Sequence, residues 1–209
     1  MLNVKSFSLG PLQTNCYLLT GEDLGRGVIV DPGMNPGPLL RAVETMEIEA
    51  ILLTHAHFDH MGGVDEVRKL KGCPVYLHPL ESEWLGNAKL NGSLMWEEVS
   101  PPLTTEPAEY ELAQGQTLTL IGHSFKVYHT PGHSPGSVSF LNGNDLFSGD
   151  VLFKQGVGRT DLPGGRERDL IDSLRLKLYK LDDTVKVYPG HGPRTTIGYE
   201  KANNPYVRA

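Results

Sequence analysis

Apolar and polar positions in the first third of the chain predict short strands that alternate with helices. Residues 3–9 alternate between apolar and polar side chains, residues 15–20 form a short mixed run, and the apolar residues 27–31 end at the turn Asp31-Pro32-Gly33. Each of these segments is typical of a strand. Apolar residues at helical spacing and continuous apolar runs then predict two helices, 39–46 and 64–70, and two buried strands, 50–53 and 74–77.

The second half of the chain is richer in strand patterns. Residues 82–107 contain both tryptophans and the pair Pro101-Pro102, and we expect them to be partly helical and then a loop. After them come predicted strands at 117–121, 124–129, 137–141 and 145–147, the last running into 151–153. A last long helix carries apolar residues on one face, Leu170, Ile171, Leu174, Leu178 and Leu181, and a final strand is predicted at 184–188.

Each half of the chain therefore offers strands first and a helix after. Two sheets packed together, with helices on both outer faces, would satisfy that order, so the sequence predicts an α/β fold. A length of 209 residues suits one domain, residues 1–209, or two closely fused halves around a shared core. The 24 glycines and 15 prolines imply many tight turns between short elements.

Charge and composition narrow the partners that we expect. The net charge of −6 disfavours a nucleic-acid partner, because phosphate binding needs clustered Lys and Arg. The two cysteines, Cys16 and Cys73, lie beside apolar runs and are interpreted as small buried hydrophobes. The N-terminus lacks the apolar core of a signal peptide, and no window approaches the ~20 apolar residues of a membrane span. We therefore expect a cytoplasmic protein with no membrane partner.

Four potential metal ligands lie in T-H-A-H-F-D-H, residues 54–60, directly after a predicted buried strand. His55 and His57 are two residues apart, so on an extended backbone they project to the same side. Asp59 and His60 lie where the chain turns toward the next helix and can point elsewhere. Such a cluster favours a metal site over scattered surface histidines, and it can supply two adjacent metal positions.

Three more potential ligands follow or adjoin predicted strands far along the chain. His133 lies in T-P-G-H-S-P-G-S, Asp150 in S-G-D and His191 in Y-P-G-H-G, where glycine lets the backbone approach a crowded site. Side chains at the ends of several strands can converge at one edge of a sheet sandwich, and imidazole with carboxylate suits Zn(II), Fe(II) or Mn(II). The remaining three histidines are interpreted as strand-end or surface residues: His78, His123 and His129.

The combined pattern H-x-H-x-D-H, G-H-S-P-G-S, S-G-D and G-H-G resembles the metallo-β-lactamase superfamily, over residues 31–192. The resemblance implies a four-layer αββα metallo-β-lactamase sandwich with two divalent metal ions per chain in the cleft between the sheets. Zinc is the expected metal, and iron or manganese are the alternatives. By the family pattern, the ligands divide into one set for each metal and a bridge: His55, His57 and His133; Asp59, His60 and His191; and Asp150 between them.

The resemblance also implies a hydrolytic chemistry. Two divalent ions lower the pKa of a bound water and polarise a scissile carbonyl. Asp59 would additionally accept a proton, and Asp31 matches a family aspartate that supports the site. No convincing protein nucleophile accompanies these residues.

Within the superfamily the chain resembles the glyoxalase II group, the hydroxyacylglutathione hydrolases. It shares T-H-x-H-x-D-H-x-G-G, T-P-G-H-S-P-G-S and S-G-D-V-L-F followed by G-V-G-R. The group cleaves thioesters such as S-lactoylglutathione, so a small-molecule thioester is the expected substrate, and Arg159 falls where the group binds a carboxylate of glutathione. Two departures leave the thiol carrier open. Only a short segment follows His191 in place of a helical C-terminal domain, and Asp161 stands where the group has an aromatic.

The run G-R-T-D keeps a second function in view, because it resembles both the persulfide dioxygenases, which hold a single iron, and the small stand-alone hydrolases of the same branch. The alternative is thus a mononuclear iron persulfide dioxygenase that uses the first-metal residues with Asp150. A non-catalytic metal-binding protein is disfavoured by the full ligand set, and a true β-lactamase by the absence of an export signal. Nucleic-acid cleavage by relatives uses extra domains. The sequence predicts neither the native metal nor the oligomeric state.

Overall fold

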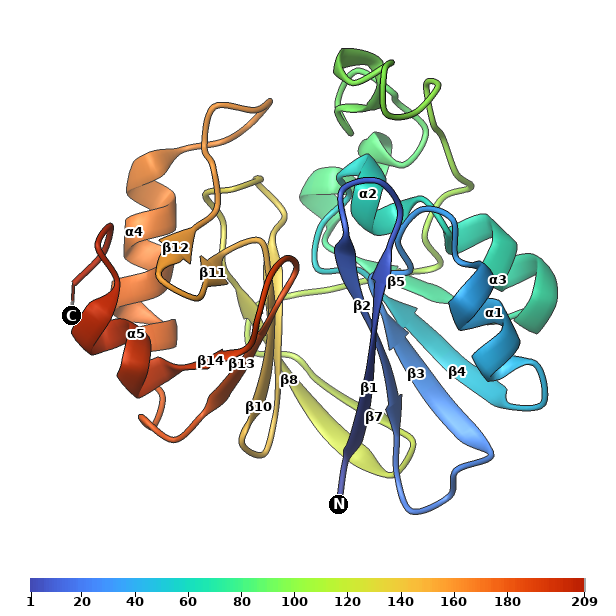
Figure 1. Ribbon diagram of the computed structural model, residues 1–209, viewed down its shortest axis with the longest axis horizontal. Helices are drawn as coiled ribbons and strands as arrows, with labels where there is room; N and C mark the ends of the chain where they lie inside the picture. Colours follow the sequence, from blue (N-terminus) through green and yellow to red (C-terminus); the bar gives the residue numbers. More distant parts are fainter. Residues whose placement is uncertain (209) are drawn as a thin grey trace.

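The computed structural model describes residues 1–208, and in this part of the chain two six-stranded sheets pack face to face (Figure 1). The first sheet has the order β1 (Asn3–Leu9), β2 (Thr14–Thr20), β3 (Arg26–Val30), β4 (Glu47–Leu52), β5 (Val75–Leu77), β6 (Tyr110–Glu111). The second has the order β14 (Thr195–Thr196), β13 (Lys186–Pro189), β10 (Asp145–Gly149), β9 (Val138–Asn142), β8 (His123–His129), β7 (Thr117–Leu120). β11 (Leu152–Phe153) and β12 (Gly156–Val157) form a small separate hairpin.

Helices cover the outer face of each sheet (Figure 1). α1 (Gly37–Val43) and α3 (Val64–Lys71) lie against the first sheet, and α4 (Glu167–Leu176) and α5 (Ile197–Asn203) lie against the second. The shorter helical segments are α2 (Phe58–Met61) and three 3₁₀ turns, η1 (Pro79–Trp84), η2 (Ser93–Met95) and η3 (Leu178–Lys180). This is the four-layer αββα arrangement that the sequence predicted.

The layers hold together because the central strands are apolar on both faces. In β3, Ile29 belongs to the buried cluster beneath α1 and α3, whereas Val28 and Val30 belong to the cluster between the sheets. In β10, Leu146 packs in the cluster beneath α4 and α5, and Phe147 points into the space between the sheets. Each such side chain contributes roughly 1.5–3 kcal/mol by its burial. A strand buried on both faces lacks the simple alternation of a half-exposed strand, which explains the continuous apolar runs in the sequence.

Two parallel strand pairs bring the polar motifs to one edge of the sandwich. β3 and β4 run parallel in the first sheet, and β10 and β13 run parallel in the second. The carboxyl ends of parallel strands meet at the same edge of a sheet. The segments that begin at Asp31, Thr54, Asp150 and His191 therefore emerge at this edge.

Residues 82–107 contain 3₁₀ helical turns and then a loop, as expected, and most other predicted elements lie where the sequence placed them, with three corrections. The predicted run 145–153 is two strands in different sheets, separated at Asp150. The helix predicted to extend to Leu181 ends at Leu176; Leu178 is nevertheless buried, in η3. It is also not the last helix, because α5 follows it.

No helix within residues 1–208 is both long enough and apolar enough to cross a membrane. A cytoplasmic location stays a prediction.

Candidate metal centre

Three buried histidines form what we call the first group: His55, His57 and His133. His55 and His57 follow β4, and the backbone at His57 is extended just before α2 begins. His133 comes from the loop between β8 and β9 in the other sheet. His57 Nδ1 lies 2.9 Å from His133 Nε2, and one ring nitrogen of each residue lies within 4.8 Å of the others.

A second group contains Asp59, His60 and His191. Asp59 and His60 lie on the single turn α2, and His191 follows β13. His191 Nε2 is 3.2 Å from Asp59 Oδ2 and 3.3 Å from His60 Nε2. The sequence motif 54–60 thus contributes side chains to both groups, as its change from extended to helical backbone predicted.

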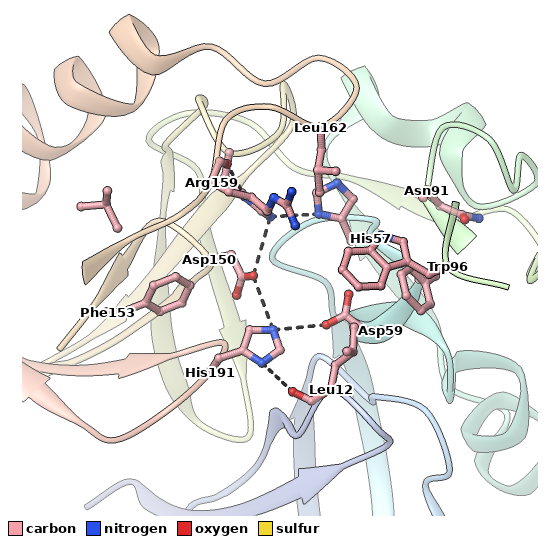
Figure 2. Close-up of a pocket in the computed structure, with 14 residues that line it drawn as sticks. Leu12, His57, Asp59, Asn91, Trp96, Asp150, Phe153, Arg159, Leu162 and His191 are labelled. Carbon is pink, nitrogen blue, oxygen red and sulfur yellow. Dashed lines mark hydrogen bonds and ion pairs between the residues drawn. The ribbon is translucent and has the colours of Figure 1, made fainter. Parts of the chain in front are cut away.

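Asp150 lies between the two groups. One of its oxygens, Oδ1, is 3.3 Å from His60 Nε2, and the other, Oδ2, is 3.5 Å from His191 Nε2 and 3.7 Å from His133 Nε2. Figure 2 shows its carboxylate facing His191 at the bottom of the cavity. A Cβ atom at position 190 would lie 2.0 Å from Asp150 Oδ1, so this close approach requires a glycine there.

Polar atoms without partners show that the residues fit a metal. Three buried atoms make no hydrogen bond within residues 1–208: His55 Nε2, His57 Nε2 and Asp150 Oδ1. Unpaired buried polar atoms are rare and costly, so several of them at one place fit the ligand atoms of a metal ion. Imidazole and carboxylate at this spacing are ligands that divalent metals use.

Hydrogen bonds orient the first group. Thr54 Oγ1 donates its only proton to Asp31 Oδ2 at 2.6 Å, so its 3.0 Å contact with His55 Nδ1 places the proton on that nitrogen. The unpartnered Nε2 of His55 then carries a lone pair. His133 Nδ1 similarly donates to the backbone oxygen of Arg159 at 2.8 Å, which leaves Nε2 of His133 for the site.

The second group is held from other segments. Asp31 has a left-handed backbone with φ of 50°, and its Oδ2 lies 3.0 Å from His60 Nδ1. Thr14 donates a 2.8 Å hydrogen bond to Asp59 Oδ2, and His191 Nδ1 lies 3.1 Å from the backbone oxygen of Leu12. The turn between β1 and β2, with the first residue of β2, therefore supports two of the three side chains. The contacts of Asp31 with Thr54 and His60 are those of a supporting residue.

Burial keeps the first group neutral. Burial, reinforced by the neighbouring His133, lowers the pKa of His57 to about 3. The same desolvation lowers the pKa of His55 and of His133 below the ordinary range. Neutral imidazole is the form that binds a metal.

Carboxylates give the second group the opposite tendency. Burial would lower the pKa of His60, but the charges of Asp150 and Asp59 outweigh it and raise that pKa. A hydrogen bond with Asp59 likewise raises the pKa of His191 against its burial. The histidine charges in turn overcome burial at Asp150 and lower the pKa of that carboxyl to about 2.

A cavity of about 420 Å³ opens over both groups (Figure 2). Apolar side chains form most of its remaining wall: Leu12, Phe58, Trp96, Phe153, Val157 and Leu162. Arg159 also lines the cavity, and its guanidinium lies 5.9 Å from the centre of the Trp96 ring. Asp161 binds the same guanidinium through two 2.7 Å hydrogen bonds. Arg159 thus reaches the predicted position, but it already has a counter-ion.

All seven predicted ligands converge, and the three histidines that were set aside belong to neither group. The rings of His78 and His129 stack on each other with centroids 4.1 Å apart, and His123 begins β8. The role of the seven as ligands stays a prediction. Sequence reasoning missed the wall residue Trp96, because its segment has no periodicity, and the buried Glu81 beneath the site.

Comparisons with known proteins agree with this geometry. A family model described as the metallo-beta-lactamase superfamily matches residues 9–191. The chain is 41% identical over 203 residues to a probable metallo-hydrolase of Bacillus subtilis, YqgX, covering 95% of this chain and 94% of that protein. It is similar to the structure of the BLEG-1 B3 metallo-beta-lactamase, with 46% identity, a TM-score of 0.93 and full coverage of both chains. It is also similar to TTHA1623 in a di-iron-bound form, with 44% identity, a TM-score of 0.86 and coverage of 98% and 100%.

Two more distant relatives bear on the substrate. The chain is 31% identical over 223 residues to the hydroxyacylglutathione hydrolase GloC of Haemophilus influenzae, covering 100% of this chain and 99% of that protein. It is 27% identical to ETHE1 from Myxococcus xanthus, with a TM-score of 0.79 and coverage of 97% and 83%.

Proposed function

The chain belongs to the metallo-β-lactamase superfamily and is a metallo-hydrolase, and from this premise we propose that it hydrolyses a thioester such as S-lactoylglutathione or a related hydroxyacyl thiol. We further propose two divalent ions per chain, with zinc preferred and iron or manganese as alternatives. The likeness to GloC supports the thioester, because that protein carries the name of a hydroxyacylglutathione hydrolase.

One observation carries the two-metal proposal. Two complete groups of three side chains lie on either side of one carboxylate, Asp150, whose Oδ1 is near the second group and whose Oδ2 is near both. A mononuclear site would need only one of these groups. The first group would hold one ion and the second group the other.

The side chains around the cavity would orient the substrate and handle the proton. When bound, two divalent ions supply an activated water and a Lewis acid for the carbonyl. Asp59 lines the cavity, and Thr14 donates a hydrogen bond to its Oδ2. In this proposal its carboxylate would accept a proton as water adds to the carbonyl. The apolar wall, with Trp96 and Phe153, would exclude bulk water from the acyl group and so strengthen the polar interactions at its base. Arg159, at the same wall, would bind a carboxylate of the thiol carrier.

A persulfide dioxygenase is the second candidate. The run G-R-T-D and the likeness to ETHE1 favour it, and the first group with Asp150 would hold its single iron. The intact second group argues against it, because a mononuclear enzyme has no use for those three side chains.

Metal analysis paired with a substrate panel tests the proposal. The protein, reconstituted with zinc, should contain two ions per chain and should cleave S-lactoylglutathione or a simple hydroxyacyl thioester. The His123→Ala variant should keep this activity, and Asp150→Ala should lose it. Oxygen uptake with glutathione persulfide by a one-iron form would establish the dioxygenase instead. Cleavage of a chromogenic cephalosporin without any thioesterase activity would point to the activity named for BLEG-1 and would rule out our proposal.

A further inference from the structure

A fully buried glutamate lies directly beneath the first group. Glu81 is on the 3₁₀ turn η1, just after β5, and its side chain has no exposed surface. A buried carboxylate is costly unless several donors satisfy it. The hydrogen-bond donors around the Glu81 carboxylate therefore show which segments this side chain connects.

Both oxygens of Glu81 accept backbone hydrogen bonds from segments that carry metal ligands. Oε2 accepts from the Ala56 N–H at 2.6 Å, and Oε1 accepts from the Gly136 N–H at 2.7 Å. Ala56 lies between His55 and His57, and Gly136 lies three residues after His133. The two loops extend from strands of different sheets, so one side chain on a third segment connects the loops that carry all three residues of the first group.

The packing leaves little freedom around this connection. A Cβ atom at Gly136 would lie 2.9 to 3.0 Å from Cγ, Cδ and Oε1 of Glu81, so the backbone rests against the carboxylate. Burial raises the pKa of Glu81, while hydrogen bonds from Ser134 and the two backbone groups favour its ionised form. Without Glu81, the N–H groups of Ala56 and Gly136 would be buried without this acceptor.

We infer that Glu81 is a positioning residue that sets the spacing between His55, His57 and His133 and thereby the affinity of the first group for its metal. The inference rests on the proposed metal-binding function. Contacts that orient ligands typically change metal affinity by about 10- to 100-fold. Ala56 shares the motif 54–60 with Asp59 and His60, but only the first group has both of its segments held by Glu81, so we expect the larger effect on the first group.

Glu200 offers a matched control. It is also fully buried, and it also joins separate segments, through the Gln155 N–H at 2.9 Å and the Thr195 hydroxyl at 2.6 Å. It lies on α5, away from both groups of ligands. Glu81→Gln and Glu200→Gln therefore make the same chemical change in a buried carboxylate. Only Glu81 lies next to the histidines of the first group.

The experiment titrates metal-free protein with Co(II) against a competing chelator and follows the visible absorption of the bound ion. Wild type should bind two ions. Glu81→Gln should weaken one of them by about 10-fold or more and alter its spectrum. Glu81→Asp, which keeps the charge but is shorter, should show a smaller loss. Glu200→Gln should bind both ions as wild type does, even where both glutamine variants have lower melting temperatures.

A double-mutant cycle assigns the effect to the first group. Glu81→Gln should still weaken binding in the His191→Ala background, where the first group is intact, and should add little in the His133→Ala background. Wild-type affinities in Glu81→Gln, or an equal loss in Glu200→Gln, would overturn the inference while leaving the proposed function standing. If Glu81→Gln does not fold, the metal affinity of Glu81→Asp is compared with that of wild type and Glu200→Gln instead. Failure of the wild type to bind any metal would overturn both.

Discussion

The first and second groups lie on opposite sides of Asp150, yet their surroundings differ. The first consists only of imidazoles, and the rings are almost completely buried. The second includes the carboxylate of Asp59, and the side chain of its outer member, His191, is 30% exposed. Burial keeps the first histidines neutral, as their lowered pKa values show, whereas nearby carboxylates raise the pKa of His60 and of His191.

The supports of the two groups differ as well. Glu81 and the Arg159 carbonyl hold the first group from within the sandwich. The second group depends partly on Leu12, in the turn between the first two strands, and on Thr14, the first residue of β2. A single bridging carboxylate thus joins a closed position to a more open one. We expect the open position to release its ion more readily. From the largest expected effect to the smallest, two predictions test this difference, and two more concern the cavity wall and the acid stability of the fold around the groups.

Loss of the shared ligand should affect both groups at once. Asp150→Ala removes an anion that faces both, so thioesterase activity should fall by more than about 100-fold, the upper range for loss of a merely supporting contact. Asp145→Ala, at the other end of the same strand, should keep activity within a few-fold. Steady-state kinetics and elemental analysis measure both. An Asp150→Ala protein that retained two ions would refute the bridge.

Removal of one ligand from each group should separate the two positions. His191→Ala should retain one ion per chain after dialysis, because the buried first group stays complete. His133→Ala should lose the first-group ion, and its remaining ion should exchange faster with added chelator. Elemental analysis and chelator kinetics check this. Equal retention and equal exchange in the two variants would show that the difference in burial has no effect on the metals.

Truncation of Arg159 should change substrate binding without changing metal binding. Its carbonyl supports His133 and survives in Arg159→Ala, while the guanidinium is lost from the cavity. Because Asp161 already partners that guanidinium, KM for S-lactoylglutathione should rise by about 10-fold, the lower end for a charge-assisted hydrogen bond, with kcat nearly unchanged. Asp161→Asn should lower this KM. An equal rise in KM for a simple thioester without the glutathione moiety would show that Arg159 only stabilises its loop.

The free energy of unfolding depends on pH through His78, which lies outside the metal site. This dependence must be known before a release of metal at low pH can be assigned to the site. Burial, with the stacked His129, lowers the pKa of His78 to about 4. The pKa of a histidine in the unfolded chain is about 6.5. Below that pH, His78 binds a proton in the unfolded chain but stays neutral in the folded chain. Stability should therefore fall as pH decreases from about 6.5 toward 4. Melting temperatures of metal-free wild type and His78→Asn should diverge over this range, and parallel curves would contradict the assignment.

The local pattern of apolar and polar residues was sufficient to predict structure wherever that structure depends on a single segment of the chain. The alternation in residues 3–9 predicted the bounds of β1, because the polar side chains Lys5, Ser6 and Ser8 are exposed between partly or fully buried apolar ones. The motif 54–60 predicted which side chains separate, because the backbone changes there from extended to helical. Whether the chain forms one domain and which metal it binds stay predictions.

Only the tertiary structure determined how distant segments combine. Glu81 meets Gly136 across 55 positions of sequence, and the cavity wall brings Trp96 and Phe153 together with Leu162. Leu178 keeps its predicted burial although the helix has already ended, because packing against the second sheet, not helical period, holds it there. Periodicity and spacing are properties of a short stretch of backbone and can be taken from the sequence. Distances between stretches depend on how whole layers pack, and no single stretch encodes them.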